Sequence, residues 1–272
     1  MKNTDFNVTF IGFGNMGSAI VRGISKENLF SEINVVESDN SKFDNFGNPK
    51  IKFMTSINSE IKKSHFIWLC IKPQSFREVL LELKKYINSE QVIISIMAGI
   101  TINQINKYSN HDRTVRVMPN TPAQVSKGIS VWTYKNNLEK SENEIIQQTL
   151  NSFGKSIFVE DETKINIATA LSGSGPGFIF RILESFILAG QKAGLEKNVS
   201  EKLAIETLIG SAELINSTNS KPKELREAVT SQGGTTEAGL DFLNQNKIDQ
   251  LITDTIITAV NRGRQLSEES DD

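Results

Sequence analysis

Residues Val8 to Ile20, Val-Thr-Phe-Ile-Gly-Phe-Gly-Asn-Met-Gly-Ser-Ala-Ile, are the stretch that decides the fold. An apolar run leads directly into Gly12-x-Gly14-x-x-Gly17, and an apolar helical pattern begins immediately behind it. This order predicts a strand, a tight turn and a helix. In a dinucleotide-binding fold the first glycine permits the turn, the second lets a pyrophosphate approach the backbone, and the third lets the helix pack closely on the strand.

The start of that helix would offer free N–H groups and the positive end of its dipole to phosphate groups. The cofactor-binding residues predicted at this turn are Gly12, Gly14, Asn15, Met16 and Gly17. Glycines also gather in ordinary turns, so it is the position between a strand and a helix that favours the dinucleotide interpretation.

The composition favours a globular protein of one large or two ordinary domains, because the chain has 272 residues of which 38% are hydrophobic. The net charge is -2, and Lys and Arg are scattered along the chain, so we expect no nucleic-acid partner. The apolar runs at 66–71 and 92–100 are too short to cross a bilayer, and the start of the sequence lacks a signal-peptide pattern. We expect no membrane partner and a soluble, cytoplasmic protein.

Cysteine and histidine are scarce. Cys70 is the single cysteine, and His65 and His111 are the two histidines. This excludes an intrachain disulfide and a cysteine-based zinc site, and we expect no metal. Cys70 lies in a predicted apolar strand, which indicates a buried, unreactive thiol.

The second predicted strand, Ile33 to Val36, ends at an acidic residue. Glu37 follows it, about twenty residues after the last glycine of the turn, where a carboxylate can bind the adenine ribose 2′-hydroxyl and so favour NAD over NADP. Glu37 and the adjacent Ser38 are therefore candidate cofactor residues. The alternative is that Glu37 and Asp39 are solvated turn residues, with Lys42 as the nearest cation.

Further strands alternate with helices up to about residue 118, and two more strands are predicted after that point. The strands are predicted at Ile51–Phe53, Phe66–Ile71, Val92–Ile96, Thr114–Met118, Gly128–Trp132 and Ser156–Val159. This alternation predicts an open parallel sheet whose ligand lies at the carboxyl ends of the strands. Lys72, Ala98 and Asn120 follow such ends, and Pro73 stops the strand before it. The alternative is that these residues only terminate strands.

The chain divides into a doubly wound Rossmann-type domain, 1–160, and an all-helical domain, 161–272. A capping box at Ser141-x-x-Glu144 predicts the last helix of the first domain. In the second, Val199–Ser217 has an apolar stripe with Ser200 placed as its cap, and residues 248–260 have another. Wide apolar faces indicate a homodimer through helix packing. The acidic tail 268–272 is predicted to be disordered.

Two small-residue stretches, Leu171–Gly177 and Thr230–Thr236, interrupt the helical half. Glycine costs about 1 kcal/mol and proline about 3 kcal/mol within a helix, so function is expected to retain them. The second stretch can direct backbone N–H groups and the hydroxyls of Ser231 and Thr236 at one anion, such as a small carboxylate. The alternative is a plain turn between helices with threonine as an N-cap.

Together these stretches resemble the pyrroline-5-carboxylate reductases, which make L-proline. The matching stretches are Gly12–Gly17, Ile71–Pro73, Met97–Gly99, Arg116–Pro122, Leu171–Pro176 and Val229–Thr236, in the order and approximate spacing of that family. The resemblance implies a Rossmann domain, a helical dimerisation domain and, often, dimers assembled into a decamer.

The resemblance also implies roles for single residues. The substrate carboxylate and ring nitrogen would be held by Ser231, Gly233, Gly234, Thr235 and Thr236. Lys72, Pro73, Ala98 and Asn120 would lie along the nicotinamide half of the cofactor, and Asn58 near the ribose. Three features depart from the family pattern: Gln232 replaces a proline, Gly177-Phe178 replaces an Ala-Tyr pair, and the Ser/Asn-Arg associated with NADPH is missing after the second strand.

By this resemblance the substrate is the cyclic imine 1-pyrroline-5-carboxylate, the product is L-proline, and NADPH or NADH donates the hydride. Thr236 is the candidate catalytic residue, as a hydrogen-bond donor that orients the ring nitrogen, because a threonine hydroxyl is a poor acid. The alternatives are another Rossmann reductase of the imine or 3-hydroxyacid type, or a non-catalytic dinucleotide-binding dimer. The hydroxyacid enzymes usually rely on a helical lysine, which is missing from 172–177.

Overall fold

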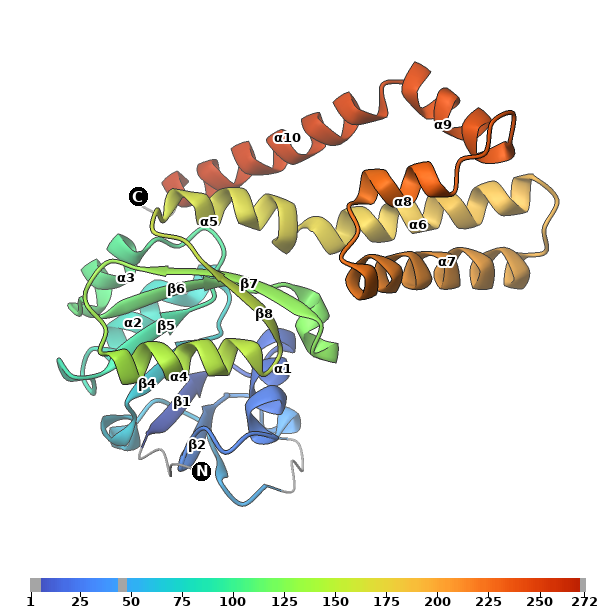
Figure 1. Ribbon diagram of the computed structural model, residues 1–272. Coiled ribbons are helices and arrows are strands. Elements are labelled where there is room, and N and C mark those ends of the chain that lie inside the picture. Colours follow the sequence, from blue (N-terminus) through green and yellow to red (C-terminus); the bar gives the residue numbers. More distant parts are fainter. Residues whose placement is uncertain (1–5, 44–47, 270–272) are drawn as a thin grey trace. The chain divides into compact units, whose positions relative to one another are not determined.

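The computed structural model describes residues 6–43 and 48–269, and it contains an eight-stranded sheet in the order β3-β2-β1-β4-β5-β6-β7-β8 (Figure 1). The strands are β1 Asn7–Ile11, β2 Glu32–Val36, β3 Ile51–Met54, β4 Phe66–Leu69, β5 Val92–Ser95, β6 Thr114–Met118, β7 Gly128–Tyr134 and β8 Gly154–Phe158. Neighbouring strands are parallel except β6 and β7, which are antiparallel. The first six strands follow the doubly wound order of dinucleotide-binding folds, which confirms the predicted fold class.

Helices cover both faces of this sheet. The helices α1 Asn15–Ser25 and α4 Lys140–Asn151 bury one apolar cluster, and α2 Phe76–Leu83 and α3 Ile102–Ser109 bury the other. Phe66 and Trp68 of β4 belong to the first cluster, and Ile67 and Leu69 to the second. A strand that is buried on both faces has no polar side, which is why this segment reads as one continuous apolar run.

Short helical turns connect the longer elements. They are the 3-10 turns η1 Asn40–Lys42, η2 Ser59–Lys63, η3 Pro73–Ser75 and η4 Thr121–Val125. The helix α5 Thr163–Ala168 is followed by one π-helical turn, η5 Thr169–Gly173. The predicted interruption of the helix at Leu171–Gly177 is confirmed: α5 ends at Ala168, a π turn and a bend at Ser174 follow, and the next helix begins at Gly175. Small side chains permit the wider π turn between the two α-helices.

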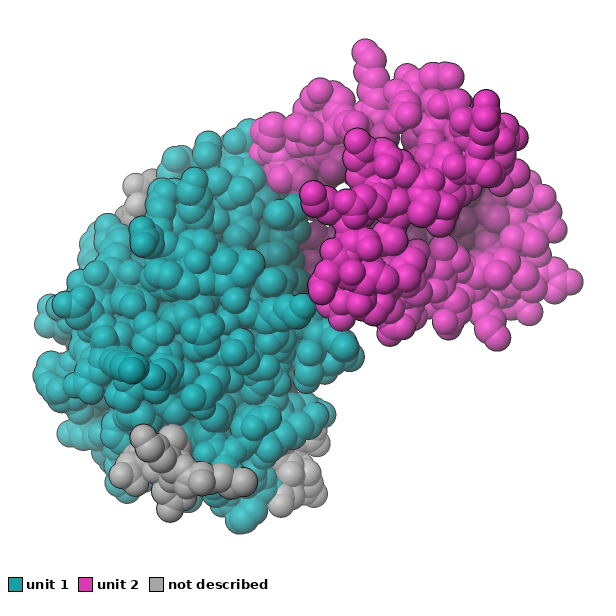
Figure 2. All heavy atoms as spheres, in the orientation of Figure 1, with its two compact units in different colours: residues 1–174, 259–272 teal, residues 175–258 magenta. Residues whose placement is uncertain are grey.

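Contacts divide the chain into two compact units, residues 1–174 with 259–272, and residues 175–258 (Figure 2). The helices beyond the π turn are α6 Gly175–Lys192, α7 Lys197–Thr218, α8 Pro222–Ala228, α9 Thr235–Gln245 and α10 Ile248–Glu269. The predicted limits 1–160 and 161–272 stay a prediction. Within 175–258, all of which the structure describes, Ser200 is the one buried residue, and large apolar side chains such as Phe186 and Phe242 are exposed.

Two predicted helix caps are wrong. Helix α4 is capped at Glu139, whose N–H donates to the Glu142 carboxylate at 2.7 Å, two residues before the predicted box. Glu142 is fixed there because Arg113 also pairs with it at 2.6 Å. Ser200 lies inside α7, where its hydroxyl donates to the Ile187 carbonyl of α6 at 2.7 Å. In both places a contact with another element decided the position.

The first two residues of the predicted disordered tail, Glu268 and Glu269, are helical. Helix α10 continues through Glu268 to Glu269, so the prediction of disorder is wrong for these two residues. The remainder of that prediction, residues 270–272, lies outside the described residues. None of the described helices is long and apolar enough to cross a membrane.

Candidate active site

The glycine turn joins β1 to α1 as predicted, and two of its glycines are required by close contacts. Gly12 has a φ of 96°, and a Cβ there would lie 2.5 Å from the carbonyl oxygen of Cys70. A Cβ on Gly17 would lie 2.5 Å from the carbonyl oxygen of Gly12. Side chains at these positions would overlap backbone atoms, so Gly12 and Gly17 shape the turn and hold α1 against the sheet.

Gly14 faces open space instead, because a Cβ there would meet no atom of the described chain within 4 Å. It is the N-cap of α1, and no side chain among the described residues caps this end. The first N–H groups of a helix have no partner within it, so those of Asn15 and Met16 can bind an anion. This end of α1 has the form of a phosphate cradle.

A cleft of about 390 Å³ opens beside the start of α1, at the carboxyl edge of the sheet. Of the predicted cofactor residues it brings together Gly14, Asn15, Met16, Lys72, Pro73, Ala98 and Asn120. It is also lined by Cys70, Ile71, Ile96, Met97, Met118, Pro119, Thr121 and Gly173, none of which was a predicted site residue. Their position at the end of a strand or directly after it, or in the Ser-Gly-Ser motif, is the signal that could have identified them.

Asn120 is held in the cleft wall by two hydrogen bonds. Its Nδ2 donates to the Ser172 carbonyl at 3.1 Å, and its Oδ1 accepts from the Ile129 N–H at 2.9 Å. A Cβ on Gly173 would lie 2.7 Å from the Met118 methyl carbon. The π turn therefore packs on the loop after β6, and its glycine leaves room for a methionine that lines the cleft.

Lys72 is the one charged residue among those described as lining the cleft. It caps the turn η3, and its side chain is exposed. Cys70 is half-buried in the wall, and desolvation raises the pKa of its thiol, so the thiol stays protonated. The cleft thus offers one cation and no nucleophilic thiolate.

Glu37 points from the end of β2 to the glycine turn. Its Oε2 accepts from the Phe13 N–H at 3.0 Å and lies 3.2 Å from Lys42 Nζ, while its Oε1 accepts from the Asp39 N–H at 3.1 Å. Burial raises the pKa of Glu37, but the bonds from Asp39, Phe13 and Lys42 outweigh it and leave the pKa below the usual value. The alternative of a solvated turn residue is wrong for Glu37, whose side chain is 10% exposed.

Ser38 and Asn58 are not among the residues that line the cleft. Ser38 is exposed, and its hydroxyl lies 3.4 Å from Glu37 Oε1. Asn58 caps the turn η2, where its Oδ1 accepts from the Glu60 N–H at 2.9 Å. The roles of Ser38 and Asn58 toward the cofactor stay predictions.

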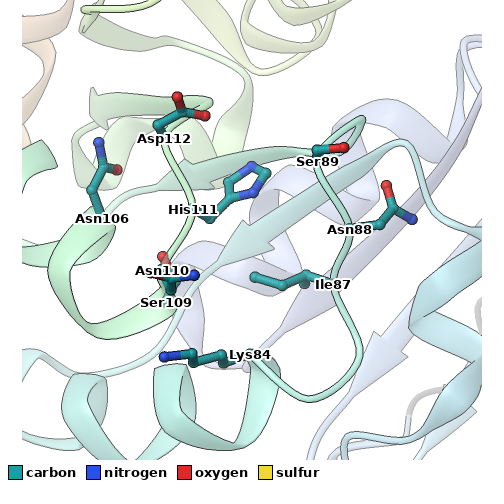
Figure 3. Close-up of a pocket in the computed structure, with 9 residues that line it drawn as sticks. All are labelled: Lys84, Ile87, Asn88, Ser89, Asn106, Ser109, Asn110, His111 and Asp112. Atoms are coloured by element: carbon teal, nitrogen blue, oxygen red, sulfur yellow. The ribbon is translucent and has the colours of Figure 1, made fainter.

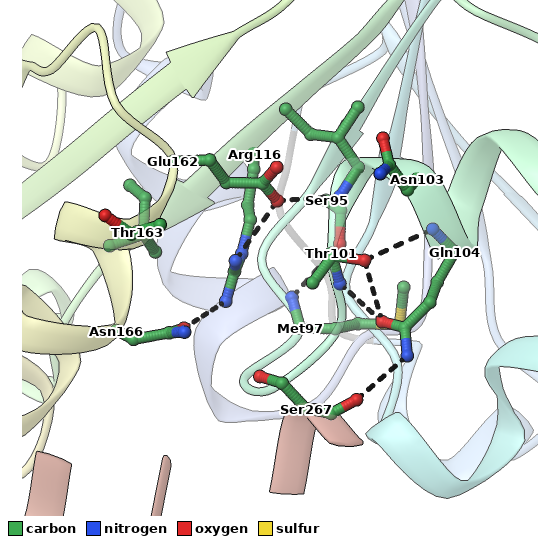
Figure 4. Close-up of polar contacts among 12 residues, drawn as sticks. Ser95, Met97, Thr101, Asn103, Gln104, Arg116, Glu162, Thr163, Asn166 and Ser267 are labelled. Atoms are coloured by element: carbon green, nitrogen blue, oxygen red, sulfur yellow. Dashed lines mark hydrogen bonds and ion pairs between the residues drawn. The ribbon is translucent and has the colours of Figure 1, made fainter. Parts of the chain in front are cut away.

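A buried arginine connects β6 to α5 (Figure 4). Arg116 is 1% exposed, and its guanidinium reaches Glu162 at 3.2 Å and Asn166 at 3.0 Å. Glu162 also accepts from the Ile102 N–H at 2.8 Å and pairs with Lys135 at 3.0 Å. Desolvation lowers the pKa of Arg116, and Glu162 opposes this shift. The network fixes the helix that leads into the π turn of the cleft wall.

The predicted substrate loop lies in residues 175–258, between α8 and α9. Helix α9 begins at Thr235 with Gly234 as its N-cap, so the predicted restart of the helix is confirmed. The Gly233 N–H donates to the Glu237 carboxylate at 2.7 Å, and the Gly234 N–H donates to the Ser231 carbonyl at 3.0 Å. The two glycine N–H groups that were predicted to hold an anion therefore have partners within the chain.

The other predicted donors of this loop are differently placed. The N–H groups of Thr235 and Thr236 are the first two of α9, which have no partner within the helix. Thr236 is partly buried, and Ser231 is exposed. An anion bound at this loop would therefore be contacted by the N–H groups at the start of α9 and by the hydroxyls of Ser231 and Thr236, rather than by the N–H groups of the two glycines.

A wider groove of about 500 Å³ lies at the opposite edge of the sheet, before β5 and β6 (Figure 3). It is lined by Lys84, Ile87, Asn88, Ser89, Asn106, Ser109, Asn110, His111 and Asp112, none of which is a predicted site residue. His111 Nε2 lies 2.8 Å from the Gln91 carbonyl, and burial lowers its pKa, so the ring is neutral at pH 7. This groove is far along the strands from the glycine turn.

Comparison with known proteins covers both parts of the chain. A model described as pyrroline-5-carboxylate reductase dimerisation matches residues 162–266, and one described as NADP oxidoreductase, coenzyme F420-dependent, matches residues 7–99. The pyrroline-5-carboxylate reductase of Arabidopsis thaliana is 32% identical over 97% of this chain and 96% of its own. The chain belongs to the pyrroline-5-carboxylate reductase family. The resemblance found in the sequence motifs is confirmed.

Solved structures of pyrroline-5-carboxylate reductases have the same fold. The enzyme from Coxiella burnetii superposes with a TM-score of 0.90 at 31% identity, covering 97% of this chain and 99% of that one. The Plasmodium falciparum pyrroline carboxylate reductase, whose crystal structure has NADP bound, gives 0.83 at 28% identity and covers 96% and 98%. These matches span the sheet and the helices, so the two-part fold is that of the pyrroline-5-carboxylate reductases.

Proposed function

We propose that this chain reduces 1-pyrroline-5-carboxylate to L-proline with NADPH or NADH. The observation that carries the proposal is the family match over 97% of the chain. It is supported by a cleft at the carboxyl edge of a doubly wound sheet, which is where such folds bind dinucleotides.

The residues of the cleft fit a dinucleotide. The open space at Gly14 allows a pyrophosphate to approach the backbone, and the N–H groups of Asn15 and Met16 would bind its oxygens. Lys72, Pro73, Ala98 and Asn120 would line the nicotinamide half, and Asn120 is already fixed by its bonds to Ser172 and Ile129. When bound, the reduced nicotinamide supplies the hydride for the imine carbon.

The loop before α9 would hold the substrate. The substrate carboxylate would be bound by the N–H groups of Thr235 and Thr236 and by the Ser231 hydroxyl. Gly233 and Gly234 would set the backbone shape of the loop. The Thr236 hydroxyl would donate a hydrogen bond to the ring nitrogen of the neutral imine and accept one from that nitrogen once it is protonated. A protonated imine is already electrophilic, so positioning is the main task of these residues.

The proposal includes a homodimer through the helical part of the chain. It is supported by the match to a dimerisation model over residues 162–266 and by exposed apolar side chains such as Phe180, Phe186 and Phe242. Light scattering after gel filtration tests it: a dimer has twice the 30.2 kDa mass of one chain, and a decamer has ten times that mass. The predicted cytoplasmic location is part of the proposal, and fractionation of the source cells tests it.

An absorbance assay of the reduced cofactor tests the activity. The purified chain should oxidise NADPH or NADH when 1-pyrroline-5-carboxylate is added and should form L-proline in equal amount. The matched control is 1-pyrroline, which has the imine and lacks the carboxylate, and it should react far more slowly. Binding of a cofactor without any turnover would favour the non-catalytic alternative and contradict the proposal.

A further inference from the structure

The end of β2 is the place where a doubly wound fold distinguishes its two cofactors. In such folds a carboxylate there binds the 2′-hydroxyl of NADH, or a nearby cation receives the 2′-phosphate of NADPH. This chain has Glu37 at that position, fixed to the glycine turn by its 3.0 Å bond from the Phe13 N–H. The carboxylate is therefore held beside the cofactor cradle by the backbone of the cradle itself.

The charges of Glu37, Asp39 and Lys42 sum to minus one. Lys42 lies 3.2 Å from Glu37 and 3.9 Å from Asp39, so a single lysine faces two carboxylates. Hydrogen bonds outweigh burial at Glu37, and bonds from Ser41 hold the pKa of Asp39 below its usual value. Both carboxylates are therefore ionised at pH 7. A 2′-phosphate would add a charge of about -1.5 to -2 beside them.

One oxygen of Glu37 can accept a ribose hydroxyl. Its Oε2 is occupied by the Phe13 N–H and Lys42, but its Oε1 has the Asp39 N–H at 3.1 Å and only a long contact, 3.4 Å, from the Ser38 hydroxyl. Ser38 is exposed and can rotate to solvent. A ribose hydroxyl could take its place on Oε1 without breaking a short hydrogen bond.

We infer that Glu37 and Asp39 make this chain select NADH over NADPH, with Glu37 as the residue that contacts the ribose. Lys42 acts as the partner that keeps Glu37 in place and is already engaged by two carboxylates. The inference deepens the proposed function, which includes either cofactor, and rests on it for the reaction concerned.

Binding measurements on the full chain test the inference without turnover. Titration of NADH and of NADPH, followed by nicotinamide fluorescence and calorimetry, should give a Kd for NADH lower by about tenfold or more. Added salt should reduce the part of this difference that comes from Asp39, whose side chain is 50% exposed, because salt screens exposed charges. A Kd for NADPH equal to or below that for NADH would overturn the inference.

Two variants assign the preference to residues. Glu37→Gln keeps an oxygen for the Phe13 N–H and removes the charge, so the ratio of the two Kd values should fall by about fivefold or more. Asp39→Asn, at a side chain that is 50% exposed, should lower the ratio by about twofold. The second variant keeps the test valid if the first does not fold.

The matched control is Glu32→Gln. Glu32 lies at the other end of β2 and pairs with Lys52, so this variant loses a carboxylate and an ion pair from the same strand. It should leave the ratio unchanged. A ratio that moves equally in Glu32→Gln, or that Glu37→Gln and Asp39→Asn both leave unchanged, would refute the assignment.

Lys42→Ala tests the opposite interpretation of these contacts, in which Lys42 binds the 2′-phosphate of NADPH. If Lys42 received a 2′-phosphate, this variant would weaken NADPH binding and leave NADH binding intact, and that result would overturn the inference. We expect Lys42→Ala to weaken the binding of NADH, because Glu37 loses the cation that keeps it in place. Failure of the proposed function would appear separately, as cofactor binding with no reduction of 1-pyrroline-5-carboxylate.

Discussion

The chain contains two glycine-rich turns, and they are built for different reasons. At the turn after β1, Cβ atoms on Gly12 and Gly17 would each lie 2.5 Å from a carbonyl oxygen. At the turn before α9, Gly233 has a φ of 71°, yet a Cβ there would meet no atom of the described chain within 4 Å. Gly12 is therefore required for packing and conformation, whereas Gly233 is required for conformation alone. Its neighbour Gly234 is restricted locally, because a Cβ there would lie 2.9 Å from the carbonyl oxygen of Ser231 in the same turn. Substitutions in the two turns should therefore separate effects on folding from effects on binding.

The largest effect is expected for Gly12→Ala. It forces a left-handed conformation on alanine and places its Cβ against the Cys70 carbonyl, so we expect a loss of about 3 kcal/mol in the free energy of unfolding. Urea denaturation measures this loss, and cofactor titration should show weakened binding of NADH and NADPH alike. An unchanged urea midpoint would show that the turn relaxes and would remove the contrast between the two turns.

The next effect is expected for Thr236→Ala in the second turn. Loss of one hydrogen bond made in the transition state should lower kcat/KM by about 10 to 1000-fold. Thr236→Ser, which keeps the hydroxyl, is the control and should recover most of the activity. Steady-state kinetics with 1-pyrroline-5-carboxylate measure both variants. If Thr236→Ala has wild-type rates, Thr236 has no part in the mechanism.

Gly14→Ala should affect binding more than folding. Its Cβ would point into open space, and its φ of -74° suits alanine, so the free energy of unfolding should change by less than about 1 kcal/mol. The same Cβ would obstruct a pyrophosphate, so the Kd of the cofactor should rise about tenfold. Calorimetry provides the Kd. A variant with normal affinity would show that phosphate does not approach Gly14.

The smallest effect on stability is expected for Gly233→Ala. Left-handed alanine costs about 1 kcal/mol, and no steric overlap adds to it. The matched control is Gly239→Ala inside α9, where alanine should stabilise the helix by up to about 1 kcal/mol. Thermal unfolding compares the two. A loss at Gly233 as large as that at Gly12 would mean that the second turn is also required for packing.

The sheet was predictable because each of its strands carries a local signal. Phe66–Leu69 is buried on both faces, so its sequence is apolar throughout, and Gly12 to Gly17 marks the strand-turn-helix order within ten residues. Seven predicted cofactor residues meet at one cleft because the carboxyl ends of parallel strands share an edge. That convergence follows from topology, which the alternation of strands and helices already implies.

The errors lie where distant residues compete for the same group. Glu142 became the cap partner of α4 because Arg113, far away in the sequence, fixes it at 2.6 Å. Ser200 packs against α6, where its hydroxyl finds the Ile187 carbonyl, so it is no longer a cap. Sequence patterns record which residues can cap a helix, but a contact from another element decides which one does.

The sequence by itself determined the fold class, the glycine turn and the family, because periodicity, steric limits on glycine and ordered motifs are local properties. Only the tertiary structure decided that Glu37 is hydrogen-bonded to the cradle, that the π turn forms a wall of the cleft, and that Arg116 reaches Glu162. Each of these depends on a hydrogen bond or a packing contact between separate segments, and its geometry exists only once the chain has folded.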